Sequence, residues 1–358
     1  VSAGYYGYVA GPAADFTTLF SLYSLSVAFF MPTIALSNSV AYTVLTNNNY
    51  DTIKAFPPIR TMGTVGFICA MLFVNFVGFD NGSVGVNFGT SATFLSFQNT
   101  YAQFYVSGFL GLLLFLFSFS LPNCPVNSKE GKMSLSDALG LKAFALFKER
   151  KMAIFFIFSM LLGVSLQITN GYANPFITSF KDVPDFANSW GANNANALIS
   201  LSQVSDTLCI LLIPFVLKRF GIKKVMLMAV VAWVLRFGLF ATGVWMFVLS
   251  MIVYGIAFDF FNVSGSLFVD KETDTNIRSS AQGVFMMMTN GFGATIGMIG
   301  AQYIVNHFVF SQTDINTQLE GWKTAWFIFA GYALIVTILF AILFKYKHNV
   351  KDVENIKH

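Results

Sequence analysis

The chain is poor in charged residues, and this scarcity excludes most soluble protein classes. Asp, Glu, Lys and Arg make up 11% of its 358 residues, whereas about 25% is usual in soluble domains. Hydrophobic residues make up 55%, and the mean hydropathy is +0.64. A globule in water cannot hide that much apolar surface, because surface-to-volume scaling leaves much of it wet. The composition therefore predicts a protein that is solvated by lipid.

Cysteine and histidine are also scarce. An odd number of scattered cysteines argues against a disulfide framework, and their spacing fits no metal site. These residues are Cys69, Cys124 and Cys209. The histidines form no cluster; they are His307, His348 and His358. The chain begins with Val1 rather than Met, and no signal peptide precedes the first apolar run. We therefore expect the N-terminus to be incomplete.

Long apolar runs, in contrast, are abundant in the chain. A spanning helix needs about 20 mostly apolar residues. Nine runs meet this requirement: 16–45, 60–79, 102–121, 153–173, 195–217, 225–243, 245–268, 280–305 and 325–344. The runs are continuously apolar rather than alternating, which disfavours a membrane barrel. The sequence thus predicts an all-α membrane protein with nine spans.

Lysine and arginine alternate between the connections of these spans. They are frequent in 122–152, 218–224, 269–279 and the segment after 344. They are almost missing from 80–101, 174–194 and 306–324. Basic loops remain on the cytoplasmic side of a membrane. This alternation predicts a cytoplasmic C-terminus and places Val1 outside.

The longest basic connection divides the spans into three and six. Many transporters consist of two six-helix halves joined by a cytoplasmic loop. We therefore expect twelve helices, of which the first three are missing here; a true nine-span protein is the alternative. The predicted parts are the remainder of an N-terminal half (1–121), the inter-half loop (122–152), a six-helix C-terminal half (153–344) and a cytoplasmic tail (345–358).

Four charged residues lie in or beside apolar runs: Arg60, Asp206, Arg236 and Asp259. A charge near the bilayer centre costs about 3 kcal/mol on insertion scales, so such residues usually face a cavity or a partner. Asp259 lies near the middle of its span. A buried carboxyl favours its neutral form, so Asp259 is a candidate proton carrier. The alternative is a structural Asp paired with a neighbouring helix.

Polar side chains accompany the acids at helical spacing. Asp206 follows Gln203 by three residues, and Asn170 follows Gln167 by three. Each pair forms a hydrogen-bonding stripe on one helix face. Polar contacts that hold neighbouring helices together are the alternative explanation for the first pair.

Two arginines, Arg60 and Arg236, also lie in or beside the apolar runs. Arg60, Thr64 and Phe67 follow one another on one face of the second span. They are candidate ligand contacts, although a snorkelling arginine would explain Arg60 equally well. Arg236 is predicted to reach the outer interface and is not assigned to the site.

The mixture of these side chains indicates a ligand class. Amides and hydroxyls recognise hydroxyl groups and ring heteroatoms, and aromatic faces such as those of Tyr254 and Phe258 stack on rings. A neutral polar molecule with a flat part fits, as in a sugar or a nucleoside. Gly293 and Gly297 form a G-x-x-x-G pair that permits close helix contact.

Several motifs together resemble the bacterial nucleoside:H⁺ symporter family of the major facilitator superfamily. They are Phe56-Pro-Pro-Ile-Arg60, Leu166-Gln-Ile-Thr-Asn170, Ala257-Phe-Asp-Phe-Phe-Asn262, Ala145-Leu-Phe-Lys148, Ala153-Ile-Phe-Phe-Ile-Phe-Ser-Met-Leu-Leu162 and Met288-Thr-Asn-Gly-Phe-Gly293. Lys218-Arg-Phe-Gly-Ile-Lys-Lys224 also resembles a basic turn of the superfamily. The resemblance implies proton-driven import of purine and pyrimidine nucleosides across the bacterial inner membrane. It implies a central site and alternating access. We expect a monomer with no cofactor and no nucleic-acid partner.

The resemblance also assigns roles to residues. Substrate contacts would be Arg60, Thr64, Phe67, Gln167, Asn170, Gln203, Tyr254 and Phe258. Proton coupling would fall to Asp259 and Asp206. Asp206 departs from the family pattern, which has Glu there, so its reach is shorter by one methylene.

Two other functions remain open from the residues alone. One is a sugar or oligosaccharide symporter of the same superfamily. The other is an intramembrane aspartyl enzyme in which Asp206 and Asp259 share a proton. Neither Tyr-Asp nor Gly-x-Gly-Asp surrounds these acids, so we expect no enzyme.

Overall fold

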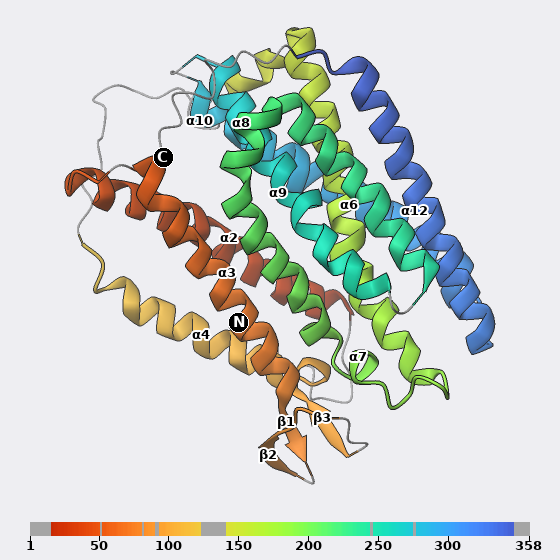
Figure 1. The fold of residues 1–358 in the computed structure, drawn as a ribbon. Helices are drawn as coiled ribbons and strands as arrows, with labels where there is room; N and C mark the ends of the chain where they lie inside the picture. Colours follow the sequence, from red (N-terminus) through yellow and green to blue (C-terminus); the bar gives the residue numbers. More distant parts are fainter. Residues whose placement is uncertain are drawn as a thin grey trace. The chain divides into compact units, whose positions relative to one another are not determined.

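The computed structural model describes residues 16–50, 52–80, 82–89, 93–122, 141–243, 246–274 and 277–346. Residues 1–15, most of the predicted inter-half loop and most of the predicted tail therefore lie outside the described part. The chain forms two compact units, Val1–Glu130 and Gly131–Lys357, which we call the N-terminal and C-terminal units. Helices dominate both units (Figure 1).

The N-terminal unit contains three helices and a small sheet. The helices are α2 (Phe16–Asn47), α3 (Thr52–Phe76) and α4 (Ala102–Ser118). The strands are β1 (Val77–Asp80), β2 (Ser83–Val86) and β3 (Phe94–Ser96), followed by the 3₁₀ helix η1 (Phe97–Asn99). The sheet is antiparallel with the order β2-β1-β3, and Val77 pairs with Val86. It connects α3 to α4, where the sequence predicts only a connection without basic residues (Figure 1).

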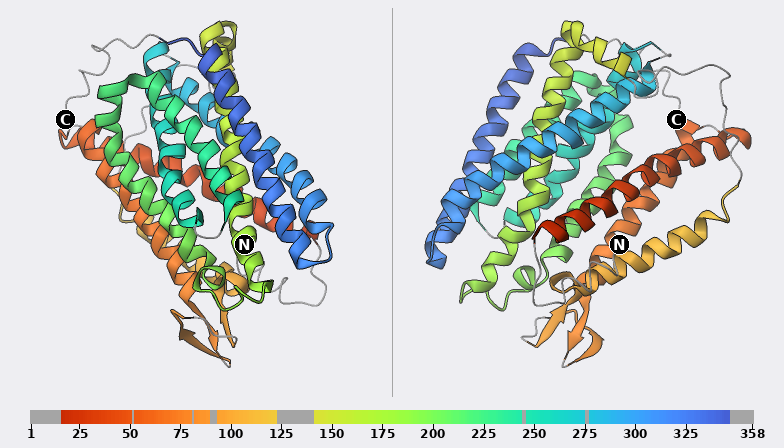
Figure 2. Two further views of the ribbon diagram at one scale, coloured as in Figure 1. Left: turned by 45° about the vertical axis from the view of Figure 1, so that its right-hand side comes forward. Right: turned by 180° about the vertical axis from the view of Figure 1, so that it is seen from behind.

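The C-terminal unit is a bundle of long helices. In chain order it contains η2 (Leu141–Lys148), α6 (Arg150–Ser179), η3 (Phe180–Asp182), α7 (Trp190–Asn193), α8 (Ala195–Thr242), α9 (Met246–Glu272), α10 (Arg278–Met286), η4 (Met287–Gly293), α11 (Ala294–Val305), η5 (Asn306–Phe310) and α12 (Ile315–Leu343). Both η4 and η5 are π-helical. Helices α6, α8, α9 and α12 run side by side in all views (Figure 2).

Helix α8 consists of two helices that meet at Gly221. This glycine has φ 78° and ψ 163°, a conformation that only glycine adopts readily. Lys218, Arg219, Lys223 and Lys224 surround it. The structure therefore places a sharp reversal within the predicted basic turn.

Six helical segments of the described residues are long and apolar enough to cross a membrane. They are Arg150–Asp182, Ala195–Phe220, Ile222–Thr242, Met246–Glu272, Ser280–Phe310 and Ile315–Leu343. Shorter apolar helices occupy Phe20–Phe30, Thr61–Phe76 and Ala102–Ser118. All nine predicted runs thus contain helix, and six of them meet this criterion for a span.

Glycines let helices approach one another closely. A Cβ atom on Gly297 of α11 would lie 2.8 Å from the Val164 Cα atom of α6. One on Gly255 of α9 would lie 2.5 Å from the Ser205 carbonyl oxygen of α8. Lipid supplies no hydrophobic force between helices, so such close van der Waals packing holds them together.

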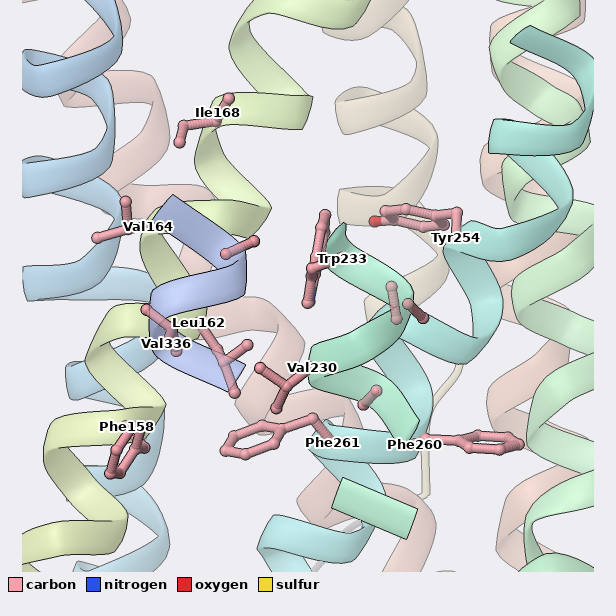
Figure 3. Packing of buried hydrophobic residues seen from close by; sticks show 14 of the residues in the cluster. Phe158, Leu162, Val164, Ile168, Val230, Trp233, Tyr254, Phe260, Phe261 and Val336 are labelled. Atoms are coloured by element: carbon pink, nitrogen blue, oxygen red, sulfur yellow. The ribbon is translucent and has the colours of Figure 1, made fainter. Parts of the chain in front are cut away.

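Aromatic side chains fill the interior of the C-terminal unit. Figure 3 shows Leu162, Val230 and Phe261, from α6, α8 and α9, meeting at the centre of the bundle. Near the end of α8, the centre of the Phe240 ring lies 4.6 Å from that of Trp326, which is fully buried. These large rings fix the rotation of each helix about its axis, which decides where the polar side chains point.

One end of the unit carries an ion pair. Lys151 Nζ at the start of α6 lies 2.6 Å from Glu272 Oε2 at the end of α9. The same ammonium lies 5.4 Å from the Phe268 ring centre and 4.7 Å from that of Tyr346. The beginning of α6, the end of α9 and the segment after α12 therefore meet at one end.

Candidate functional site

The C-terminal unit places most of the predicted site residues on three helices. Helix α6 carries Gln167 and Asn170, helix α8 carries Gln203 and Asp206, and helix α9 carries Tyr254, Phe258 and Asp259. Asp259 is 3% exposed, and Asp206 and Tyr254 are each 6% exposed. Gln167, Gln203 and Phe258 are half-buried, and Asn170 is exposed.

Tyr254 is the centre of this group. The Gln203 side chain lies within reach of its hydroxyl, and both Asp206 and Asp259 are close enough to act on it electrostatically. The Phe258 ring lies 5.8 Å from the Tyr254 ring, and their planes differ by 9°. The structure thus brings Gln203, Asp206, Phe258 and Asp259 together around one phenol.

The two acids occupy one electrostatic environment. Both act on the Cys209 thiol as well as on Tyr254. Asp206 Oδ1 and Asp259 Oδ2 are sealed from solvent. A carboxylate that loses its hydration needs nearby cations, hydrogen-bond donors or a proton. The arrangement is therefore suited to exchanging charge for a proton.

Arg236 belongs to the same group, and the prediction that it reaches the outer interface is wrong. The residue is 1% exposed, on α8. Arg236 Nη1 donates a hydrogen bond of 2.6 Å to the Ser250 carbonyl oxygen, and Nε donates one of 3.4 Å to Thr169 Oγ1. The guanidinium carbon lies 4.5 Å from the Tyr254 ring centre. The cost of a buried charge singled out Arg236 in the sequence, but position along the span does not reveal which way it points.

Trp233 is a second residue that the sequence prediction missed. Its ring meets the Tyr254 ring edge-on, with centres 6.1 Å apart and an angle of 90° (Figure 3). Trp233 and Arg236 are three residues apart on α8, and both contact Tyr254. This spacing places them on one helix face and was the available signal.

A small cavity lies beside the group. Trp233, Phe258, Asn262, Thr289 and Asn290 line it together with apolar residues, and its volume is about 30 Å³. That volume suits about one water molecule. Thr289 and Asn290 belong to the π-helical segment η4, and π-helical turns often occur at functional sites. The cavity therefore continues the polar face of α9 beyond Phe258.

The remaining predicted contacts belong to the N-terminal unit. Phe67 is 54% exposed and, with Tyr23, Gln103 and Tyr105, lines a cavity of about 1070 Å³ bounded by α2, α3 and α4. Thr64, three residues earlier on α3, is half-buried. The side chain of Arg60 lies outside the described part of the structure.

Comparison with known proteins gives a consistent result. The nucleoside H⁺ symporter family matches residues 2–349. The chain is 46% identical to the xanthosine permease of Escherichia coli (strain K12), covering 100% of this chain and 80% of that protein. It is also 46% identical to the nucleoside permease NupG of the same organism, covering 94% of this chain and 77% of NupG.

Solved structures agree with the sequence relatives. The crystal structure of the nucleoside transporter NupG matches with a TM-score of 0.78 and 43% identity, covering 97% of this chain and 81% of that one. A mutant of the same transporter matches with a TM-score of 0.81. These relatives are transporters rather than enzymes, and the fold is that of a major facilitator-type membrane transporter. The chain therefore belongs to the nucleoside H⁺ symporter family.

Proposed function

We propose that this chain imports nucleosides together with protons by alternating access. The observation that carries the proposal is the group around Tyr254, where two acids buried to 3% and 6% exposure adjoin an amide and a stacked aromatic pair. Charge at membrane depth is costly and is usually retained for function. A proton and a polar, flat passenger would each find a matching partner here.

The nucleobase would stack on aromatic rings. Phe258 lies parallel to Tyr254, is half-buried and lines the small cavity beside the group. Phe67 is exposed on its helix and has the same chemistry. Stacking of a base on an aromatic side chain contributes about 1–3 kcal/mol and tolerates different bases. This tolerance supports recognition of both purine and pyrimidine nucleosides.

Hydroxyl and amide groups would bind the ribose and the base edges. The Gln203 amide lies within reach of the Tyr254 hydroxyl and would offer a donor and an acceptor beside it. Gln167, Asn170 and Thr64 offer further donors and acceptors, and Arg60 would contact the ligand or an acid. A site built to pair ligand hydroxyls discriminates strongly against analogues that lack them.

Asp259, with Asp206, would carry the proton. Both act on Tyr254, so their charge is felt directly at the substrate contact. Protonation would favour nucleoside binding from outside, and release of both would reset the carrier. The proton gradient would supply the energy, so no cofactor is required.

The setting we propose is the inner membrane of a bacterium. The basic connections support a cytoplasmic C-terminus, and we expect Phe20–Phe30, Thr61–Phe76 and Ala102–Ser118 to belong to further spans. We expect the transporter to act as a monomer.

Uptake of labelled uridine by energised cells that express the protein tests the proposal. We expect accumulation that an uncoupler abolishes and that other nucleosides inhibit. Accumulation that is indifferent to the uncoupler would contradict proton coupling. Competition by free ribose or disaccharides, without competition by nucleosides, would instead indicate a sugar symporter.

A further inference from the structure

Arg236 is the one fully buried cation in the described part of the C-terminal unit whose role the proposed function leaves open. It is 1% exposed, and its hydrogen bonds and ring contacts are all with protein groups. Its contacts come from three helices: its own α8, Thr169 of α6, and Ser250 and Tyr254 of α9. We therefore ask which of these neighbours Arg236 holds in place for the transport site.

The contacts to α9 are reciprocal. Arg236 Nη1 donates to the Ser250 carbonyl oxygen at 2.6 Å, and Ser250 Oγ donates to the Arg236 carbonyl oxygen at 3.0 Å. Ser250 precedes Tyr254 by four residues, so the two side chains lie on one face of α9. The pair of hydrogen bonds therefore fixes the turn of α9 from which the Tyr254 ring projects.

The guanidinium also holds the ring itself. Its carbon lies 4.5 Å from the centre of the Tyr254 ring, within the distance of a cation–π interaction. The guanidinium carbon also lies 5.2 Å from the centre of the Phe240 ring. Trp233 closes the edge of the Tyr254 ring. These contacts hold the Tyr254 ring in place. The ring lies parallel to that of Phe258, and its hydroxyl lies near the Gln203 side chain.

We propose that Arg236 is a positioning residue for nucleoside recognition, which sets the placement of the Tyr254 and Phe258 rings and of the Gln203 amide. The inference rests on the proposed function of that ring pair. Lysine would keep the charge but lose the planar group that spans Ser250, Thr169 and the Tyr254 ring. Arg236 and Tyr254 should therefore act as one unit when the nucleoside binds.

A double-mutant cycle tests this unit. KM for uridine uptake is measured for Arg236→Gln, Tyr254→Leu and the combined variant, with transporter amounts in the membrane normalised. We expect Arg236→Gln to raise KM about 30-fold, the effect of a desolvated cation–π contact. The combined variant should match Tyr254→Leu alone, because interacting residues are not additive. An unchanged KM in Arg236→Gln, or KM effects that multiply, would overturn the proposal.

Two further variants guard against simple misfolding. Arg236→Lys retains a buried cation and should raise KM by less than Arg236→Gln. Arg219→Gln removes an arginine of the basic turn, whose guanidinium lies 5.5 Å from the Phe220 ring, and should leave KM unchanged. If Arg236→Gln does not reach the membrane, Arg236→Lys decides, since a wild-type KM in that variant contradicts the proposal.

A spectroscopic measurement separates this inference from the proposed function. The chain has 5 tryptophans, and Trp233→Phe gives the contribution of Trp233 by difference. We expect Arg236→Gln to shift the Trp233 emission because the Tyr254 ring moves from its edge, and Arg219→Gln to leave it unchanged. Absent uridine transport by the wild type would refute the function, whereas an unmoved Trp233 signal would refute the positioning role.

Discussion

Gly255 gives the most direct prediction about how helix packing supports the site. A Cβ atom added at this position of α9 would lie 2.5 Å from the Ser205 carbonyl oxygen, 2.6 Å from its carbonyl carbon and 2.8 Å from Cys209 Sγ. Two of these atoms belong to the backbone of α8, so no side chain can simply turn aside. Gly255→Ala must therefore push α9 away from α8.

The displacement would act on the site as well as on stability. Overpacking of this kind typically costs about 1–3 kcal/mol. Tyr254 is the neighbour of Gly255 on α9, and its partners Gln203 and Asp206 lie on α8 close to Ser205. A misplacement of about 1 Å in a positioned site can cost roughly 100-fold in rate. We expect Gly255→Ala to melt at a lower temperature and to lose most uridine uptake.

Thermal melting of the purified protein and initial uptake rates in cells measure both effects. Gly238→Ala is the matched control, since a Cβ atom on that α8 residue would have nothing within 4 Å. Alanine is the better helix former, so the control should be neutral or slightly stabilised. Gly255→Ala that melts and transports like Gly238→Ala would refute the reasoning.

Three other predictions follow from particular contacts. Phe258→Leu should raise KM for uridine about 5-fold or more, because base stacking is lost while the apolar volume remains; equal KM values for the two proteins would contradict a stacking role. Lys151→Glu should lower the melting temperature, and adding Glu272→Lys should restore most of it, since the pair at 2.6 Å would re-form with exchanged charges; an unrestored double variant would count against the ion pair. Asn174→Leu should cost about 1 kcal/mol of stability, measured by melting, because Asn174 Nδ2 donates to Asn196 Oδ1 at 2.6 Å between α6 and α8; an unchanged melting temperature would show that this bond contributes little.

The helical architecture could be predicted because length and composition suffice for it. An apolar run of spanning length has few alternatives to a helix in lipid. The turn at 218–224 could also be predicted, since basic residues cluster there between two apolar runs. The structure places the reversal at Gly221, whose φ is 78°. The predicted division into two halves and the inter-half loop at 122–152 stays a prediction.

The small sheet was not predicted because its signal is weak. Its strands have 4, 4 and 3 residues, too short for an alternating pattern to stand out. The pairing of Gly78 with both Gly85 and Ser96 depends on contacts across a turn and a longer loop. Such non-local contacts are not written in composition or periodicity.

The site was predicted in part for a related reason. The cost of a buried charge pointed to Asp206 and Asp259, and the structure places both beside Tyr254. The same argument should have retained Arg236, but its direction depends on how α8 is rotated against α6 and α9. That rotation is set by packing contacts between the helices. The ring centres of Trp233 and Tyr254 of α9 lie 6.1 Å apart, and those of Phe240 and Phe176 of α6 lie 5.8 Å apart.

The central claim is that Asp259 carries the proton that accompanies the nucleoside. Proton movement into proteoliposomes, followed with an internal pH dye while an inward uridine gradient is imposed, tests it most directly. We predict acidification with the wild type and with Asp270→Asn, a change on the same helix outside the site. Asp259→Asn should move no protons yet still exchange labelled for unlabelled uridine. Uridine-driven acidification by Asp259→Asn at the wild-type rate would contradict the account.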